Sequence, residues 1–185
     1  ATGDELVMPG GELTPENSVN SNSFTLSALI RHFGGEPVEL GIAKDSRQSL
    51  LTLAAKATGV DLLVTSGGAS VGDHDLVRSV LGEAGLHLDF WGVAARPGKP
   101  TLFGRLNDTP LLGLPGNPVT IVVGGLLFLR PAIAALLDLR ETPPQPESAR
   151  LTVAMEKNGP REGYLSAKST RDADGICHVT PFSRQ

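Results

Sequence analysis

The sequence predicts an α/β protein with a doubly wound, mostly parallel sheet and a small C-terminal β piece. Two observations carry this prediction. Short apolar segments alternate with helix-like segments as far as about Leu139, which is typical of strands joined by helical crossovers. A proline-rich stretch, 142–146, then interrupts the pattern, and short β-like segments follow it. We therefore expect an α/β domain over residues 1–141, a linker over 142–148 and a partial C-terminal β domain over 149–185.

The predicted helices share apolar side chains at helical spacing and a capping residue at the start or a glycine at the end. They cover residues 24–33, 46–59, 76–85 and 118–139.

The predicted strands are shorter apolar runs bounded by turn residues. They cover residues 37–43, 60–65, 88–93, 101–103 and 111–114, and in the tail 151–155, 164–169 and 176–182. Asp174-Gly175 is a typical hairpin turn between the last two.

Composition excludes several classes of protein. The 185 residues include 20 acidic and 16 basic side chains, and only 4% are aromatic, so we expect no nucleic-acid partner. The apolar run Ile121–Leu129 is about half of the ~20 residues that a membrane span requires, so we expect no membrane partner. A single cysteine, Cys177, leaves no internal disulfide and predicts a reducing, cytoplasmic location.

The strongest candidate site is the glycine-rich segment from Thr65 to Asp75, between a predicted strand and a predicted helix. Glycine backbone N–H groups, serine hydroxyls and a helix N-terminus can bind an anion there. Carboxylates beside such a cradle repel phosphate unless a divalent cation bridges them, and oxygen ligands suit Mg²⁺. The alternative is that the aspartates only cap the helix and the glycines only turn the chain. The candidate binding residues are Thr65, Ser66, Gly67, Gly68, Ser70, Gly72 and Asp73.

A second motif, Leu114-Pro115-Gly116-Asn117-Pro118, also joins a strand to a helix. Pro118 suits the first helical position and Asn117 suits the cap, so a purely structural role is as good an interpretation as a binding role.

Two further groups carry charge. Arg96 and Lys99 lie in a proline-stiffened turn that could hold a fixed anion, although two solvated surface cations are the simpler interpretation. Glu5 and Asp45 follow the ends of apolar segments, and in a parallel sheet they could converge with Asp75 on one cation. Taken singly, each carboxylate is a turn or capping residue.

In this order the motifs resemble the molybdopterin molybdenumtransferase family, which includes bacterial MoeA and the E domain of gephyrin. The matching segments are residues 2–6, 21–23, 65–75, 96–100 and 114–119. Pro-Gly-Lys-Pro followed by Leu-Pro-Gly-Asn-Pro distinguishes this family from other proteins with a molybdopterin-binding fold. The likeness is dense over residues 1–140, and the chain resembles a fragment of such a protein.

The resemblance implies insertion of molybdate into adenylylated molybdopterin, with release of AMP and assistance from Mg²⁺. It implies that the glycine-rich segment and Pro115, Gly116, Asn117 and Pro118 bind the pterin nucleotide. Asp75 is implied as catalytic and Mg²⁺-associated, with Glu5 and Asp45 as further metal ligands, while Lys99 and Arg96 would face molybdate. The family works as a homodimer.

The chain departs from the family pattern at Asn20, Gly92 and Ser166, where aspartate, lysine and arginine are common. Because the arginine is thought to help bind molybdate, a second interpretation is a non-catalytic molybdopterin-nucleotide binding or scaffold module. A third is a nucleotide pyrophosphatase of the competence-damage type, which Pro97-Gly98-Lys99-Pro100 disfavours.

Overall fold

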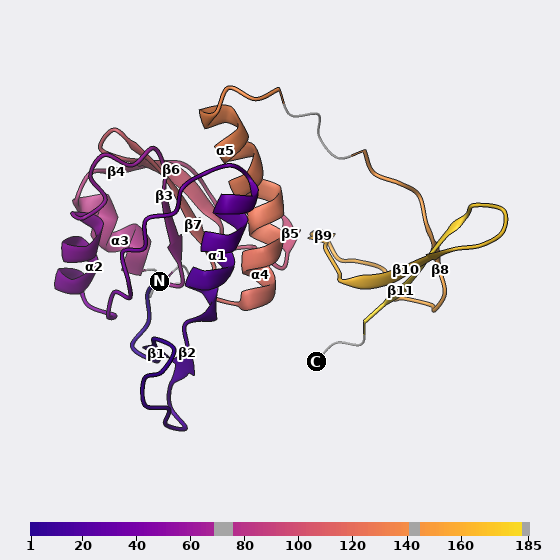
Figure 1. The fold of residues 1–185 in the computed structure, drawn as a ribbon, viewed down its shortest axis with the longest axis horizontal. Coiled ribbons are helices and arrows are strands. Elements are labelled where there is room, and N and C mark those ends of the chain that lie inside the picture. The colour runs from indigo at the N-terminus through magenta and orange to yellow at the C-terminus, as the bar shows by residue number, and fades with distance from the viewer. Residues whose placement is uncertain (69–75, 141–144, 183–185) are drawn as a thin grey trace. The chain divides into compact units, whose positions relative to one another are not determined.

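The computed structural model describes residues 1–68, 76–140 and 145–182, and the chain divides into two compact units (Figure 1). The first unit comprises Ala1–Val93 and Pro97–Arg140, and the second comprises Ala94–Arg96 and Glu141–Gln185. The predicted division, with a linker over residues 142–148, did not assign Ala94–Arg96 to the second unit.

The first unit is built on a four-stranded sheet of order β3-β7-β6-β4. Its strands are β3 (Leu63–Ser66), β4 (Leu86–Trp91), β6 (Leu102–Leu106) and β7 (Thr109–Leu114). The predicted α/β class is confirmed. Among the described strands of this sheet, however, β3 and β7 form the one parallel pair, and β6 is antiparallel to both β4 and β7. No helix separates β4, β6 and β7 along the described chain, and short connections between neighbouring strands produce antiparallel pairs.

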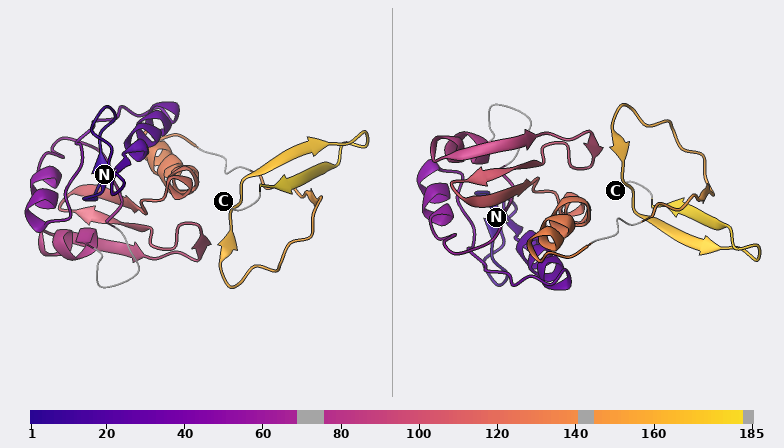
Figure 2. Two further views of the ribbon diagram at one scale, coloured as in Figure 1. Left: turned by 90° about the horizontal axis from the view of Figure 1, so that it is seen from below. Right: turned by 90° about the horizontal axis from the view of Figure 1, so that it is seen from above.

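Helices cover both faces of this sheet (Figures 1 and 2). The helices α2 (Arg47–Ala54) and α3 (Leu76–Glu83) pack on one face, in a cluster that includes the buried side chains Leu50 and Leu81. On the other face, α1 (Ser21–His32) packs with the C-terminal helices around Leu114.

The predicted helix 118–139 is one continuous helical segment with a π-helical turn. It comprises α4 (Pro118–Gly124), η1 (Gly125–Leu129) and α5 (Arg130–Leu136). The side chain of Asn117 caps α4 by accepting from the N–H groups of Val119 and Thr120, and Pro118 follows in the first turn. Residues 118–136 have the length and apolar composition that a membrane crossing requires, a test that core helices of globular proteins also meet. Here Ile121, Leu129 and Ile133 are core residues.

The N-terminal residues lie against both β3 and the segment after α1. Two short strands, β1 (Leu6–Val7) and β2 (Ser18–Val19), pair in parallel. The predicted strand 37–43 is not assigned as a strand; Ala43 forms only an isolated parallel bridge with Thr2.

The second unit consists of short strands. A three-stranded sheet of order β10-β11-β8 contains β8 (Arg150–Leu151), β10 (Ala167–Arg171) and β11 (Cys177–Pro181), while β5 (Ala95–Arg96) pairs with β9 (Glu162–Gly163).

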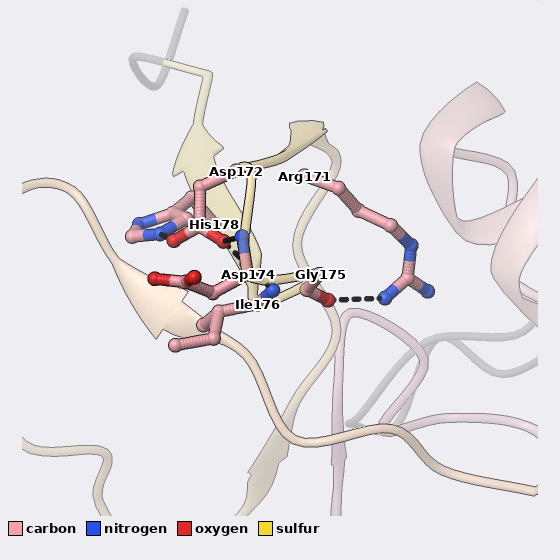
Figure 3. A network of polar contacts seen from close by, with 6 residues as sticks. All are labelled: Arg171, Asp172, Asp174, Gly175, Ile176 and His178. Atoms are coloured by element: carbon pink, nitrogen blue, oxygen red, sulfur yellow. Dashed lines mark hydrogen bonds and ion pairs between the residues drawn. The ribbon is translucent and has the colours of Figure 1, made fainter.

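The hairpin that joins β10 and β11 turns at Asp172–Ile176, as Asp174-Gly175 predicts (Figure 3). The Asp172 carboxylate accepts from the backbone N–H groups of Asp174 and Ile176 at 3.0 and 2.9 Å. Its second oxygen lies 2.8 Å from His178 Nε2. Polar contacts of one side chain therefore define this turn.

Candidate binding pocket

A pocket of about 530 Å³ lies at the C-terminal ends of the parallel strands β3 and β7. In open α/β sheets this edge is where ligands bind. The pocket is lined by Thr2, Gly3, Glu5, Leu6, Asn22, Asp45, Ser66, Gly67, Gly68, Leu76, Ser79 and Gly116. The structure thus brings together six of the predicted site residues, which are Glu5, Asp45, Ser66, Gly67, Gly68 and Gly116.

Backbone packing explains why glycine follows each strand. Gly67 donates its N–H to the carbonyl of Leu114 at 3.0 Å, which fastens the two strand ends together. Gly67 has φ +81°, and a Cβ added to it would lie 2.4 Å from the carbonyl oxygen of Thr2. A Cβ on Gly116 would lie 3.3 Å from the Cα of Gly67. Three backbone segments therefore meet without intervening side chains, because a Cβ at Gly67 or Gly116 would press against a neighbouring backbone.

Two reciprocal hydrogen bonds between Asp4 and Asp45 fix the acidic side of the pocket. The backbone N–H of Asp4 donates to the Asp45 carboxylate at 3.2 Å, and the N–H of Asp45 donates to the Asp4 carboxylate at 3.1 Å. This reciprocal contact fixes Asp45 beside the segment that carries Glu5. Glu5 and Asp45 both line the pocket.

The two carboxylates fit a hard cation. Mg²⁺ keeps several water ligands and is held by one or two carboxylates together with substrate phosphates, so Glu5 and Asp45 supply a suitable donor set. Among the described residues no cluster of three or more His, Cys, Asp or Glu side chains is placed to hold a metal ion. The third predicted ligand, Asp75, lies outside the described residues, as do Ser70, Gly72 and Asp73.

Asn22 was not among the candidate residues, although it lines the pocket and is buried. Its Nδ2 donates to the carbonyl oxygen of Gly116 at 2.7 Å, which ties α1 to the turn after β7. Its Oδ1 is buried and accepts no hydrogen bond within the described part of the chain. The sequence signal was the Ser21-Asn22-Ser23 segment, whose residue types alone indicate only a helix start.

Other predicted residues shape the site without lining it. Thr65 is buried in β3, and Pro115 is buried after β7. Asn117 caps α4 and Pro118 is its first residue, as their capping propensities predict.

Lys99 and Arg96 fall in different compact units. Lys99 is exposed on a turn of the first unit, where Gly98 accepts from both the backbone N–H and the hydroxyl of Thr101. Arg96 is exposed in β5, and its carbonyl accepts from the N–H of Tyr164. Neither side chain is among those that line the pocket.

The backbone conformation explains why glycine stands at position 92, one of the departures from the family pattern. Its φ is +85°, a left-handed conformation that glycine adopts without strain, and its N–H donates to the carbonyl of Thr101. Lysine at this position would strain the backbone.

Comparison with known proteins places this architecture in one family. Residues 1–135 match the family described as a probable molybdopterin binding domain. A molybdopterin molybdenumtransferase from Nostoc is 36% identical over 170 residues, which is 89% of this chain and 39% of the relative. One from Haemophilus influenzae is 36% identical over 159 residues, covering 85% of this chain and 39% of the relative.

Comparison with solved structures leads to the same family. The crystal structure of a molybdopterin biosynthesis moea protein from Pyrococcus horikosii superimposes with a TM-score of 0.77 and 33% identity, covering 99% of this chain and 44% of that one. The chain spans about 40% of the length of the curated relatives it matches. The match over residues 1–135 covers most of the chain and includes the pocket, so the chain belongs to the family of probable molybdopterin binding domains.

Proposed function

We propose that this chain forms the molybdopterin-binding part of a molybdopterin molybdenumtransferase, which inserts molybdate into adenylylated molybdopterin and releases AMP. The relatives from Nostoc and Haemophilus influenzae carry the name of this activity. One structural observation carries the proposal: glycine backbone from the ends of β3 and β7 meets two carboxylates in a single pocket.

The two halves of the pocket suit different parts of a pyrophosphate-linked nucleotide. Gly68 and Gly116 line the pocket, and the backbone N–H groups of such glycine-rich turns are typical phosphate ligands. Glu5 and Asp45 would hold Mg²⁺, which when bound offsets the negative charge of the phosphates. The carboxylates would otherwise repel the anion, so binding of the nucleotide and of Mg²⁺ should be mutually dependent.

Molybdate is the second substrate in this proposal. The Lys99 ammonium lies on a turn that Gly98 and Thr101 close, and a fixed cation is the group an oxyanion requires. We assign the pterin nucleotide to the pocket and molybdate to the turn that carries Lys99.

The test of the activity is molybdate-dependent release of AMP from adenylylated molybdopterin by the 185-residue chain, in a Mg²⁺ titration. Asp45→Asn and Glu5→Gln should each raise the Mg²⁺ concentration for half-maximal release, whereas Asp89→Asn, an exposed carboxylate on β4, should not. Nucleotide binding without any AMP release would favour the non-catalytic binding module. Release that is independent of Mg²⁺ in all variants would contradict the metal assignment.

A second experiment separates the two substrates. Lys99→Ala should lower molybdate affinity by about one to two powers of ten, because a charged hydrogen bond contributes ~1.5–3 kcal/mol and each ~1.4 kcal/mol is tenfold. Its affinity for AMP should stay unchanged. Calorimetry on Lys99→Ala and on the exposed control Lys56→Ala decides this, and an equal loss of both affinities would place Lys99 in the nucleotide site.

Two properties implied by the family resemblance complete the proposal. We propose that the working protein is a homodimer in the cytoplasm. Sedimentation equilibrium across a range of concentrations measures the first, and fractionation of the source cells measures the second.

A further inference from the structure

A third carboxylate, that of Asp4, stands beside the two that line the pocket. Asp4 precedes Glu5 in the chain and exchanges hydrogen bonds with Asp45. It is exposed, and it is not among the described residues that line the pocket. Its contacts therefore indicate a role other than binding a ligand there.

Different elements hold the backbones of the two pocket carboxylates. The carbonyl of Glu5 accepts from the N–H of Ser18 at 2.7 Å, next to the pairing of β1 with β2. Asp45 directly precedes Ser46, whose side chain caps α2. The placement of one carboxylate relative to the other therefore depends on the contacts between these two segments of the chain.

Asp4 takes part in most of the hydrogen bonds that join the two segments. Its backbone N–H donates to Oδ2 of Asp45 at 3.2 Å, and its Oδ1 accepts from the N–H of Asp45 at 3.1 Å. Its carbonyl accepts from Nζ of Lys44 at 3.1 Å. A further bond runs from the N–H of Gly3 to the carbonyl of Ala43 at 3.1 Å. Asp4 thus holds both the backbone and the carboxylate of Asp45.

The residue before Asp4 determines where the other carboxylate lies. Gly3 lines the pocket, and a Cβ added to it would lie 2.5 Å from Oε2 of Glu5 and 2.8 Å from Oε1. The Glu5 carboxylate therefore occupies the space that a side chain at position 3 would fill. Any larger residue at this position would displace the carboxylate, because that carboxylate is the end of a flexible side chain and moves more easily than backbone.

We propose that Gly3 and Asp4 are positioning residues for the cation site, on the basis of the Mg²⁺ role proposed above for Glu5 and Asp45. Asp4 holds the two segments together as a hydrogen-bond acceptor and does not touch the cation. Gly3 leaves the space in which the Glu5 carboxylate lies. An acceptor needs no charge, so asparagine can replace Asp4, whereas a carboxylate that binds Mg²⁺ cannot be replaced by an amide without loss of affinity.

The test measures Mg²⁺ affinity by calorimetry on the 185-residue chain saturated with AMP, for Asp4→Asn and Asp4→Ala. Both variants remove the same charge, so the difference between them isolates the hydrogen bond to Asp45. Asp4→Asn should bind Mg²⁺ about tenfold more tightly than Asp4→Ala, which is the effect of about one hydrogen bond to a charged group. Asp89→Ala, at an exposed carboxylate on β4, is the control and should match the unmodified chain.

Amide hydrogen exchange at Asp45, without metal or nucleotide, is the second readout. Exchange should be faster in Asp4→Ala than in the unmodified chain and should return towards the original rate in Asp4→Asn, because the asparagine Oδ1 accepts the same bond. Equal Mg²⁺ affinities of Asp4→Asn and Asp4→Ala would overturn the role of Asp4. If the unmodified chain bound no Mg²⁺ while Asp45 exchange followed this order, the metal assignment to Glu5 and Asp45 would fail instead, and the positioning of Asp45 by Asp4 would stand.

A double-mutant cycle tests Gly3. Gly3→Ala should lower Mg²⁺ affinity about tenfold in the unmodified chain and leave it unchanged in the Glu5→Gln background, because its effect passes through the Glu5 carboxylate. Equal losses in the two backgrounds would overturn the role of Gly3. Tm of each variant, measured without metal, separates loss of the fold from loss of the site.

Discussion

The two units of this chain are held together by different kinds of interaction. The first unit buries one apolar cluster on each face of its sheet, and Leu81, Leu114 and Leu129 in these clusters are fully inaccessible to solvent. In the second, Ala95 is the one buried residue among those that the structure describes. Its hairpin is instead organised by polar contacts, above all those of Asp172. Apolar burial therefore stabilises one unit, and local turn chemistry organises the other.

The largest expected effect follows directly from this contrast. Leu81→Ala removes a fully buried side chain from the first cluster and should cost about 2–5 kcal/mol of unfolding free energy. Leu165→Ala, at a side chain that is 48% exposed in the second unit, should stay within about 0.5 kcal/mol. Urea denaturation of both variants measures the difference, and equal losses would mean that the second unit contributes a core of its own.

Within the first unit, Gly67 of the pocket is expected to be the next most sensitive position to substitution. Gly67→Ala combines a left-handed backbone with a clash against Thr2 and should cost about 2–3 kcal/mol. Gly59→Ala is the matched control, because its φ is +71° and nothing lies within 4 Å of the added Cβ, so about 1 kcal/mol is expected. Similar losses at both positions would show that the close approach of Gly67 to Thr2 is relaxed in solution.

A smaller effect of opposite sign is expected in α3. Gly82 lies inside the helix with nothing within 4 Å of an added Cβ. Gly82→Ala should therefore stabilise the first unit by about 0.5–1 kcal/mol through helix propensity. A lower midpoint of urea denaturation in this variant would mean that the position is more crowded than the packing indicates.

The smallest expected effect is a pH dependence confined to the hairpin of the second unit. The hydrogen bond from His178, followed by the backbone N–H groups, lowers the pKa of Asp172 below its ordinary value of 3.8. A carboxyl with a lowered pKa contributes stability above its unfolded pKa, and that contribution is lost as the pH falls through the folded value. The turn should therefore open below about pH 4, as the carboxylate becomes protonated.

Amide chemical shifts of Asp174 and Ile176 report this opening. In Asp172→Asn the shifts of these two amides should lose the transition that the unmodified chain shows below pH 4. An identical transition in both proteins would assign it to another acidic group.

Much of the first unit could be predicted from sequence because its burial pattern is strong. The helix starts after Ser46 and Asn117 follow from capping chemistry, and strand β3 follows from its apolar run. In the second unit only the turn at Asp174-Gly175 has so clear a local signal. The antiparallel placement of β6 was missed, because the apolar runs of β6 and β7 resemble those of buried parallel strands. The short connection between the two strands was the signal for an antiparallel pair.

The candidate site was predictable in part. Glycine-rich segments after strands indicated the pocket, and the structure places Gly67, Gly68 and Gly116 in it. Asn22 was missed, since its contact with Gly116 spans 94 residues and no local pattern encodes it. The division of Arg96 and Lys99 between the two units was also missed, because a two-residue strand such as β5 has no periodicity to detect.

The most direct measurement of the central claim is a map of amide chemical shifts while the 185-residue chain is titrated with AMP in the presence of Mg²⁺. The glycine amides serve as reporters in both units. We predict shifts at Gly67, Gly68 and Gly116, and at the side-chain amide of Asn22, with none at Gly159, Gly163 and Gly175 of the second unit. Shifts confined to the second unit, or no shifts at millimolar AMP, would contradict the assignment of the pterin nucleotide to the pocket at the ends of β3 and β7.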